Sequence, residues 1–331
     1  MRRGIRRAAL ALALGLALAG PVQAAEPRAL VPVGRTVGLE LETDGVYVVE
    51  FEEGPEGSPG RAAGLKEGDR ILTVDGRALE TAAELRELVD RGAGAPVVLG
   101  IDRGGRSMSF RVRPVLQTEH WRLGVYVRDR ISGLGTLTFY DPESGLFGAL
   151  GHGVGQSPGA LLRLRGGLAS ETQVTEIQPG QAGTPGALRG QSSGGRPLGQ
   201  VELNTERGLF GHCLPGTIAG EALPLAAREE VRTGPAEILC GLQGGEAERY
   251  GVEIEAVRLD RERCRDLRIV VTDPRLLAAT GGIVQGMSGS PILQDGRLVG
   301  AVTHVLVQDP TRGYGILIGH MLEAAETAAA A

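Results

Sequence analysis

Glycine occupies 53 of the 331 positions, whereas aromatic residues make up only 3% of the chain. Glycine readily adopts the positive φ angles that tight turns require, and it weakens the interior of a helix. Frequent glycines between short apolar runs therefore favour strands joined by turns over a helical bundle. We predict a mostly β protein, and its length is sufficient for two domains.

Residues 1–24 have the pattern of an export signal. Four arginines precede an apolar stretch at 8–19, and Val22-Gln23-Ala24 forms a small-x-small cleavage pattern. This stretch is shorter than the roughly 20 residues that a transmembrane helix needs, although retention as a short uncleaved anchor remains an alternative. Removal of the signal lowers the net charge from −5 to −9. We therefore expect an exported, extracytoplasmic protein that binds no nucleic acid and that meets the membrane only through this segment or through partners.

The three cysteines, Cys213, Cys240 and Cys264, lack the spacing of a metal site. We predict neither a metal nor an organic cofactor. In an exported chain the cysteines form either one disulfide and one free thiol, or no disulfide. Three partly buried small side chains are the favoured interpretation.

Residues 34–114 have the pattern of a small α+β module. Short strands flank Asp44-Gly45 and Gly104-Gly105, and residues 82–89 have helical spacing. The run A-G-L-K-E-G-D-R-I-L-T-V-D-G at 63–76 resembles a bacterial PDZ domain. PDZ domains bind a peptide as an added strand, and backbone amides hold its C-terminal carboxylate.

The PDZ resemblance implies a peptide-binding groove with two walls. The carboxylate loop would be Thr36-Val37-Gly38-Leu39, and the helix at 82–89 would form the opposite wall. The alternative is a purely structural role, in which the module docks against the rest of the chain.

Residues 121–331 form the second predicted domain. Short β runs fill most of it, including a hairpin around Asp141-Pro142, and the only convincing helix follows Met321. We predict a β-barrel or a β-sandwich for this domain.

The segment Gly286-Met287-Ser288-Gly289-Ser290-Pro291 is the sharpest catalytic signal. Its glycines permit a tight turn, in which the N–H groups of Gly286 and Ser288 converge beside the serine hydroxyl. Such amides stabilise the oxyanion of a tetrahedral intermediate. A strand, a turn and a second strand follow, and the second strand would line the substrate through Thr303, His304 and Val305.

A serine hydroxyl needs an adjacent base to act as a nucleophile. His152 lies between glycines at a predicted strand end, and His304 lies one strand after the serine. The order His, Asp, Ser of chymotrypsin-like peptidases favours His152. For the orienting acid, Asp273 follows an apolar strand, but spacing alone does not select it over Asp266 or Asp309.

Several segments together resemble the stage IV sporulation protein B peptidase family. The most specific is T-G-G-I-V-Q-G-M-S-G-S-P-I at 280–292, and others lie at 123–129, 135–142, 148–152, 271–277 and 300–305. The resemblance implies a PDZ domain followed by a chymotrypsin-like double β-barrel peptidase domain. It also implies a triad of His152, Asp273 and Ser288. The residues at 153–157 depart from the family pattern, because they lack the acid that often follows the histidine.

The resemblance further implies a serine endopeptidase that cleaves a regulatory protein of a membrane-bound complex during spore formation. It would act in the intermembrane space of the developing spore, with the PDZ domain serving peptide recognition or autoinhibition. One alternative is a catalytically silent, exported PDZ adaptor. An esterase ranks lower, because the serine motif runs into a strand rather than opening a helix.

Overall fold

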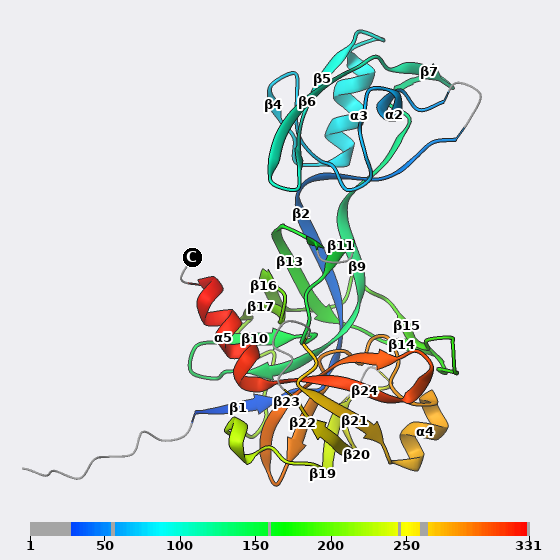
Figure 1. Cartoon of the computed structure of the whole chain (residues 1–331). Coiled ribbons are helices and arrows are strands. Elements are labelled where there is room, and N and C mark those ends of the chain that lie inside the picture. Colours follow the sequence, from blue (N-terminus) through cyan, green and yellow to red (C-terminus); the bar gives the residue numbers. More distant parts are fainter. Residues whose placement is uncertain (1–27, 54–56, 158–159, 244–245, 259–263, 330–331) are drawn as a thin grey trace, which may run out of the picture.

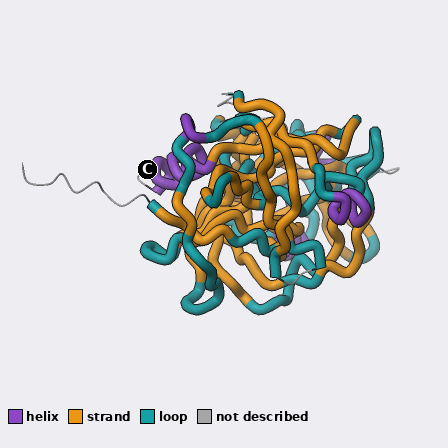
Figure 2. The backbone as a smooth tube through the Cα atoms, turned by 90° about the horizontal axis from the view of Figure 1, so that it is seen from below, coloured by secondary structure: helices purple, strands orange, loops and turns teal. Residues whose placement is uncertain are grey.

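The structure is a computed structural model, and it describes residues 28–53, 57–157, 160–243, 246–258 and 264–329. The predicted export signal at 1–24 lies outside these residues. Two packed β-barrels form the larger part of the molecule, and a smaller module stands on two long strands above them (Figure 1). Strands account for most of the backbone (Figure 2). No helix of the described residues is long and apolar enough to cross a membrane.

The first barrel is a ring of six strands. Its pairings run β2-β13-β16-β17-β10-β9, and pairing of β9 with β2 closes the ring. The short strands β1 and β18 extend it from β9. The bounds are β1 (Ala29–Pro32), β2 (Thr36–Phe51), β9 (Val125–Tyr140), β10 (Leu146–Ala149), β13 (Leu164–Glu171), β16 (Pro197–Thr205), β17 (Gly208–Cys213) and β18 (Leu223–Pro224).

The second barrel is also closed and has six strands, in the order β19-β20-β21-β24-β23-β22. Its core is a cluster of buried aliphatic side chains such as Ile238, Ile254 and Ile269. Two helices accompany it, α4 (Pro274–Thr280) and α5 (Ile318–Ala329). The strands are β19 (Gly234–Cys240), β20 (Glu248–Val257), β21 (Leu267–Val271), β22 (Pro291–Gln294), β23 (Arg297–Leu306) and β24 (Asp309–Leu317).

The upper module has its own hydrophobic core, which includes Val46, Ile71 and Leu99. Its main helix begins at a capping box, in which Thr81 and Glu84 satisfy each other's backbone N–H groups. The last residues of β2 and the first residues of β9 belong to this module. Its other elements are α2 (Pro59–Ala62), β3 (Arg70–Val74), β4 (Arg77–Ala78), α3 (Ala82–Arg91), β5 (Val97–Arg103), β6 (Arg106–Val112), β7 (Val115–Gln117) and β8 (His120–Arg122).

The remaining elements are short. They are β11 (Gly155–Ser157), β12 (Ala160–Leu161), β14 (Val174–Gln178), β15 (Ala187–Gly190) and a 3-10 helix at Arg228–Glu230. The β14–β15 hairpin lies against the second barrel, where the N–H of Leu188 donates to the carbonyl of Gln285 (2.8 Å). This places the hairpin beside the turn that contains the predicted nucleophile.

The fold class is confirmed, since the chain combines a small α+β module with a double β-barrel. The module, however, is inserted within the first barrel rather than placed before it. β2 is one continuous strand, and its residues 36–42 belong to the barrel while residues 46–51 belong to the module. The Asp44-Gly45 pair marks a shift of register, not the predicted turn between two strands.

The predicted carboxylate loop at Thr36-Val37-Gly38-Leu39 is therefore wrong. These residues lie in β2, between β9 on one side and β13 on the other. Thr36, Val37 and Leu39 are buried in the first barrel. A strand that is paired on both edges has no free N–H groups to offer a peptide.

Candidate active site

The predicted base and nucleophile come from different barrels. His152 follows β10 of the first barrel, and Ser288 precedes β22 of the second. Their loops are in contact at Gly289, which has a φ of +96°, where a Cβ would lie 2.6 Å from the backbone nitrogen of Leu150. Only glycine fits this position, because a side chain would separate the two loops.

The turn around Ser288 contains two backbone N–H groups for which the described residues provide no acceptor. Gly286 has a φ of +99°, a conformation that favours glycine. Within the described residues, no hydrogen bond uses the N–H of Gly286 or of Ser288. The Ser288 hydroxyl donates to the carbonyl oxygen of Thr303 (2.9 Å). The two N–H groups of the turn can therefore bind an oxyanion. The Ser288 hydroxyl, however, is hydrogen-bonded to β23 and not to a base.

His152 is held by its own loop. Its Nδ1 lies 3.0 Å from the carbonyl oxygen of Gly153. Since a carbonyl only accepts, this contact assigns the proton to Nδ1 and leaves Nε2 as the basic nitrogen. Burial lowers the pKa of His152 below its usual value, and the bond to Gly153 partly opposes this effect. The imidazole is therefore neutral near pH 7, as a general base must be.

His304 is the neighbour of His152. The two ring centroids are 5.1 Å apart and the rings are tilted by 37°. The Nδ1 of His304 is buried without a hydrogen-bond partner among the described residues. Burial, with smaller contributions from His152 and Arg265, lowers the pKa of His304 to about 4. Thr303 and His304 thus border the Ser288 hydroxyl and the base, and Val305 continues the strand away from them.

The structure does not bring Asp273 to His152. Asp273 is the N-cap of α4, where its Oδ1 accepts from the N–H of Arg275 (2.9 Å) and its Oδ2 accepts from Arg275 Nη2 (2.9 Å) and from the N–H of Gly251 (3.3 Å). The Arg275 side chain holds the pKa of Asp273 well below its usual range. The triad role of Asp273 stays a prediction, and in this structure its carboxylate is used elsewhere.

The two other candidate acids are also engaged away from His152. Asp266 is buried and accepts from His320 Nδ1 (2.7 Å) and from the N–H of Leu317 (2.9 Å). Asp309 bonds Thr311 and Arg312. In the described part of the chain no carboxylate contacts His152, so the Gly153 carbonyl is its only orienting partner.

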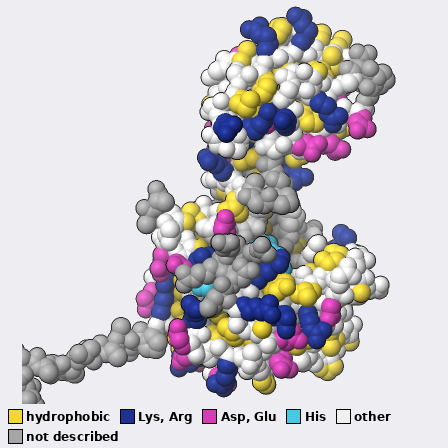
Figure 3. All heavy atoms as spheres, in the orientation of Figure 1, with side chains coloured by type: hydrophobic (Ala, Val, Ile, Leu, Met, Phe, Trp, Pro, Cys, Tyr) yellow, Lys and Arg dark blue, Asp and Glu magenta, His cyan; other side chains and the backbone are white. Residues whose placement is uncertain are grey.

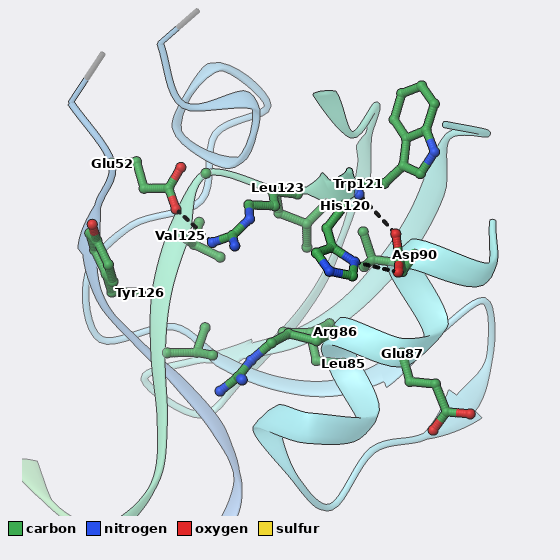
Figure 4. Close-up of a pocket in the computed structure, with 14 residues that line it drawn as sticks. Glu52, Leu85, Arg86, Glu87, Asp90, His120, Trp121, Leu123, Val125 and Tyr126 are labelled. Atoms are coloured by element: carbon green, nitrogen blue, oxygen red, sulfur yellow. Dashed lines mark hydrogen bonds and ion pairs between the residues drawn. The ribbon is translucent and has the colours of Figure 1, made fainter. Parts of the chain in front are cut away.

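A pocket in the upper module corrects the position of the predicted peptide groove. It has a volume of about 540 Å³ and lies between α3 and the start of β9 (Figure 4). Leu85 and Val89 of α3 line one side of it, and residues 123–127 line the other. Among the described strands, residues 125–128 of β9 pair only with β2, so the opposite edge faces the pocket.

The sequence contains a signal for this groove that the prediction at Thr36–Leu39 overlooked. Leu123-Gly124-Val125 places a glycine between two apolar residues, and Gly124 has a φ of +66°. This is the turn at which the chain enters β9 beside α3. It lies after the helix in sequence, whereas the predicted loop lies before it.

The candidate site contains a hydroxyl, an imidazole and two backbone N–H groups, which are the groups that acyl transfer uses. Among the described residues, no cluster of His, Cys, Asp or Glu is arranged to hold a metal ion. Also among these residues, no disulfide joins Cys213, Cys240 and Cys264. On the face shown in Figure 3, basic and acidic side chains are interspersed over both parts of the molecule.

The two barrels, the serine turn and the neighbouring histidine define a PDZ-containing serine peptidase. Comparison with known families agrees, because the SpoIVB peptidase S55 family matches residues 119–322 and a PDZ domain family matches residues 51–103. The chain belongs to the SpoIVB peptidase S55 family.

Curated relatives are similar over shorter stretches. Zinc metalloprotease RasP of Geobacillus kaustophilus is 34% identical over 87 residues, which are 25% of this chain and 20% of that protein. A putative zinc metalloprotease of Mesorhizobium japonicum is 32% identical over 92 residues, 27% of this chain and 25% of that protein. The chain thus spans a quarter or less of the length of these relatives.

Two solved structures show a distant similarity. The active form of the Rv3671c protease of M. tuberculosis is 16% identical, with a TM-score of 0.33, and the match covers 60% of this chain and 74% of that one. The PDZ domain of an SdrC-like protein of Listeria monocytogenes is 22% identical, with a TM-score of 0.23, over 26% of this chain and 90% of that one.

Proposed function

We propose that the protein is a serine endopeptidase in which Ser288 is the nucleophile and His152 is the general base. The observation that supports this most directly is the meeting of the two loops between the barrels. Two N–H groups, those of Gly286 and Ser288, have no internal acceptor among the described residues there. A neutral imidazole with a basic Nε2 lies beside the same strand, β23, to which the Ser288 hydroxyl is bonded.

In the proposed reaction, the Ser288 hydroxyl first leaves the Thr303 carbonyl and turns toward His152 Nε2. Its oxygen then attacks the peptide carbonyl carbon while Nε2 takes the hydroxyl proton. The amides of Gly286 and Ser288 bind the oxyanion. Collapse of the intermediate breaks the C–N bond, and the imidazolium returns the proton to the leaving amine. Water then hydrolyses the acyl-enzyme by the same steps.

The orienting acid requires a rearrangement in this proposal. Asp273 can support His152 only if it leaves the helix cap and Arg275. Until then the Gly153 carbonyl fixes the base tautomer without supplying a negative charge. A carbonyl stabilises an imidazolium less than a carboxylate does. We therefore propose that the described arrangement is a resting state of low activity.

The substrate we propose is a protein segment in extended conformation. Its backbone would lie along Thr303-His304-Val305, the strand predicted from the sequence to line the substrate. The PDZ groove would hold a second extended peptide as a strand added to the free edge of β9. From the family resemblance we propose an exported, extracytoplasmic peptidase that cleaves a regulatory protein of a membrane-bound complex during spore formation.

The test uses a fluorophosphonate probe, which labels activated serines. We expect it to label the chain without its predicted signal, and to label neither Ser288→Ala nor His152→Ala. The parent should also cleave casein, and neither Ser288→Ala nor His152→Ala should do so. Labelling that persists in Ser288→Ala would contradict the assignment of the nucleophile.

A second candidate function is a catalytically silent PDZ adaptor. The observation that favours it is the bond of the Ser288 hydroxyl to Thr303 instead of to His152. A folded parent chain that is never labelled, even with peptides that occupy the β9 groove, would support the adaptor. Labelling that appears only with such a peptide would support a peptidase with a resting state.

A further inference from the structure

Thr136 is a buried residue of β9 that contacts both catalytic loops at once. Its side chain is fully enclosed between the barrels. Its Oγ donates to the carbonyl oxygen of Gly286 (2.7 Å), and its N–H donates to the carbonyl oxygen of Ser288 (3.0 Å). Its own carbonyl oxygen accepts from the N–H of Leu150 (3.2 Å), two residues before His152.

These bonds restrict the conformation of the turn that carries the oxyanion donors. The Gly286 carbonyl shares a peptide plane with the N–H of Met287, and the Ser288 carbonyl shares one with the N–H of Gly289. Bonds from Thr136 to both carbonyls therefore hold the two planes on either side of the Met287–Ser288 peptide, which carries the N–H of Ser288. The N–H of Gly286 belongs to the preceding peptide, whose carbonyl oxygen at Gln285 accepts from the N–H of Leu188 (2.8 Å). In the described part of the chain, the N–H groups of Gly286 and Ser288 have no acceptor. Preorganised donors of this kind lower the barrier because they need no reorientation during the reaction.

The same residue also sets the distance between the nucleophile and the base. A Cβ at Gly289 would lie 2.1 Å from the Thr136 carbonyl oxygen, so β9 and the serine turn pack backbone against backbone. On its other side, the Thr136 carbonyl fixes the loop of His152 through Leu150. One strand position of the first barrel thus connects the base to the nucleophile turn of the second.

We propose that Thr136 is a positioning residue for the peptidase reaction, and that its hydroxyl keeps the Gly286–Ser288 turn in the conformation that binds the oxyanion. The proposal rests on the proposed function. Without the hydroxyl, the buried Gly286 carbonyl lacks a donor, and the turn gains the freedom to rotate toward another one. The strand itself remains, because residues 125–136 of β9 still pair with β2 and residues 137–140 pair with β10 and β1.

The fold offers a closely matched control in Thr36. It lies opposite Thr136 in the β2–β9 register and is also buried. Its Oγ likewise donates across the barrel interface to a carbonyl oxygen, that of Gly241 (2.9 Å), but Gly241 is not part of the serine turn. The two threonines therefore differ in which carbonyl they hold rather than in burial or bonding type.

The experiment compares Thr136→Val, Thr136→Ser and Thr36→Val in the full chain. Valine keeps the shape of threonine without the hydroxyl, and serine keeps the hydroxyl. We expect Thr136→Val to lower kcat about 10- to 100-fold, with KM changed less than about twofold. This loss is smaller than the roughly 100- to 1,000-fold loss seen when an oxyanion donor itself is removed, because Thr136 acts only through the turn. Thr136→Ser should regain most of the kcat, and Thr36→Val should keep it. The rate of fluorophosphonate labelling should follow kcat.

Three results would overturn the proposal: an unchanged kcat in Thr136→Val, an equal loss in Thr136→Val and Thr136→Ser, or an equal loss in Thr36→Val. Should Thr136→Val not fold, Thr136→Cys replaces it, since a thiol is a weak donor of similar size. A parental kcat in that variant would also contradict the proposal. Labelling of the parent and its loss in Ser288→Ala test the proposed function separately, so the two can fail independently.

Discussion

Replacement of His304 by phenylalanine should reduce the loss of folding stability that the chain suffers when the pH is lowered. The pKa of His304 in the folded chain is about 4, below the value of about 6.5 for a solvated histidine. Between these values the unfolded chain binds the proton more readily than the folded chain does. The free energy of unfolding therefore falls as the pH is lowered from about 6.5 to about 4.

The size of this effect follows from the difference between the two pKa values. At about 1.4 kcal/mol for each pKa unit, the difference corresponds to about 3 kcal/mol for a fully enclosed ring. His304 is only partly buried, and solvent screening reduces the effect, so we expect about 1.5 kcal/mol. His152 adds an effect of the same sign, because its pKa is also lowered by burial.

The assay is urea denaturation of the parent and of His304→Phe at pH 7.5 and pH 4.5. The parent should lose about 1.5 kcal/mol more stability than the variant between the two pH values. At pH 7.5 the variant should be at least as stable as the parent, since phenylalanine replaces a buried nitrogen that has no partner among the described residues. His212→Phe is the matched control, because His212 is exposed and its ring bonds Glu202. Equal acid sensitivity of the parent and His304→Phe would refute the reasoning.

Three further predictions follow from single contacts. Gly289→Ala should lower the free energy of unfolding by about 2–4 kcal/mol in urea, since its positive φ and the contact with the first barrel both oppose a side chain; a loss below about 1 kcal/mol would contradict this. Asp273→Asn should keep the helix cap and the melting temperature of the parent, whereas Asp273→Ala should lower the melting temperature. A folded Asp273→Asn chain with greatly reduced kcat would support the predicted role of Asp273 in the triad, and an unchanged kcat would argue against it. Burial raises the pKa of Cys213 to about 11 and that of Cys240 to about 12, so both should react slowly with iodoacetamide at pH 8 until urea is added; rapid alkylation of the folded chain would be inconsistent with this burial.

Local signals in the sequence predicted much of the fold. The strand, turn and second strand expected after the serine segment form a hairpin whose turn is Asp295-Gly296, with both residues at positive φ. The hairpin at Asp141-Pro142 and the helix α5 also form where the pattern placed them. The prediction that His152 acts on Ser288 came from the His, Asp, Ser order of chymotrypsin-like peptidases and from the family resemblance, because no local rule relates two residues so far apart in sequence.

The errors arose where long-range pairing determines the structure. The Asp44-Gly45 pair is a turn signal, yet pairing with β9 on both sides of it keeps β2 continuous. The helix α4 was missed because Asp273-Pro274 was interpreted as a strand end, although Asp followed by Pro is also a helix start signal. The peptide groove was misplaced because the order of the module's strands along the chain is not visible in local patterns.

The insertion of the PDZ module in the first barrel determines how the two domains can be separated. A chain that begins at residue 121 would lack β1 and β2, and with them one wall of the barrel that carries His152. Internal excision is the workable route. Glu42 of β2 lies opposite Arg130 of β9, and the two side chains form an ion pair at 2.9 Å. A short Asn-Gly linker between these two strands would restore a plain hairpin and leave a peptidase made only of the two barrels.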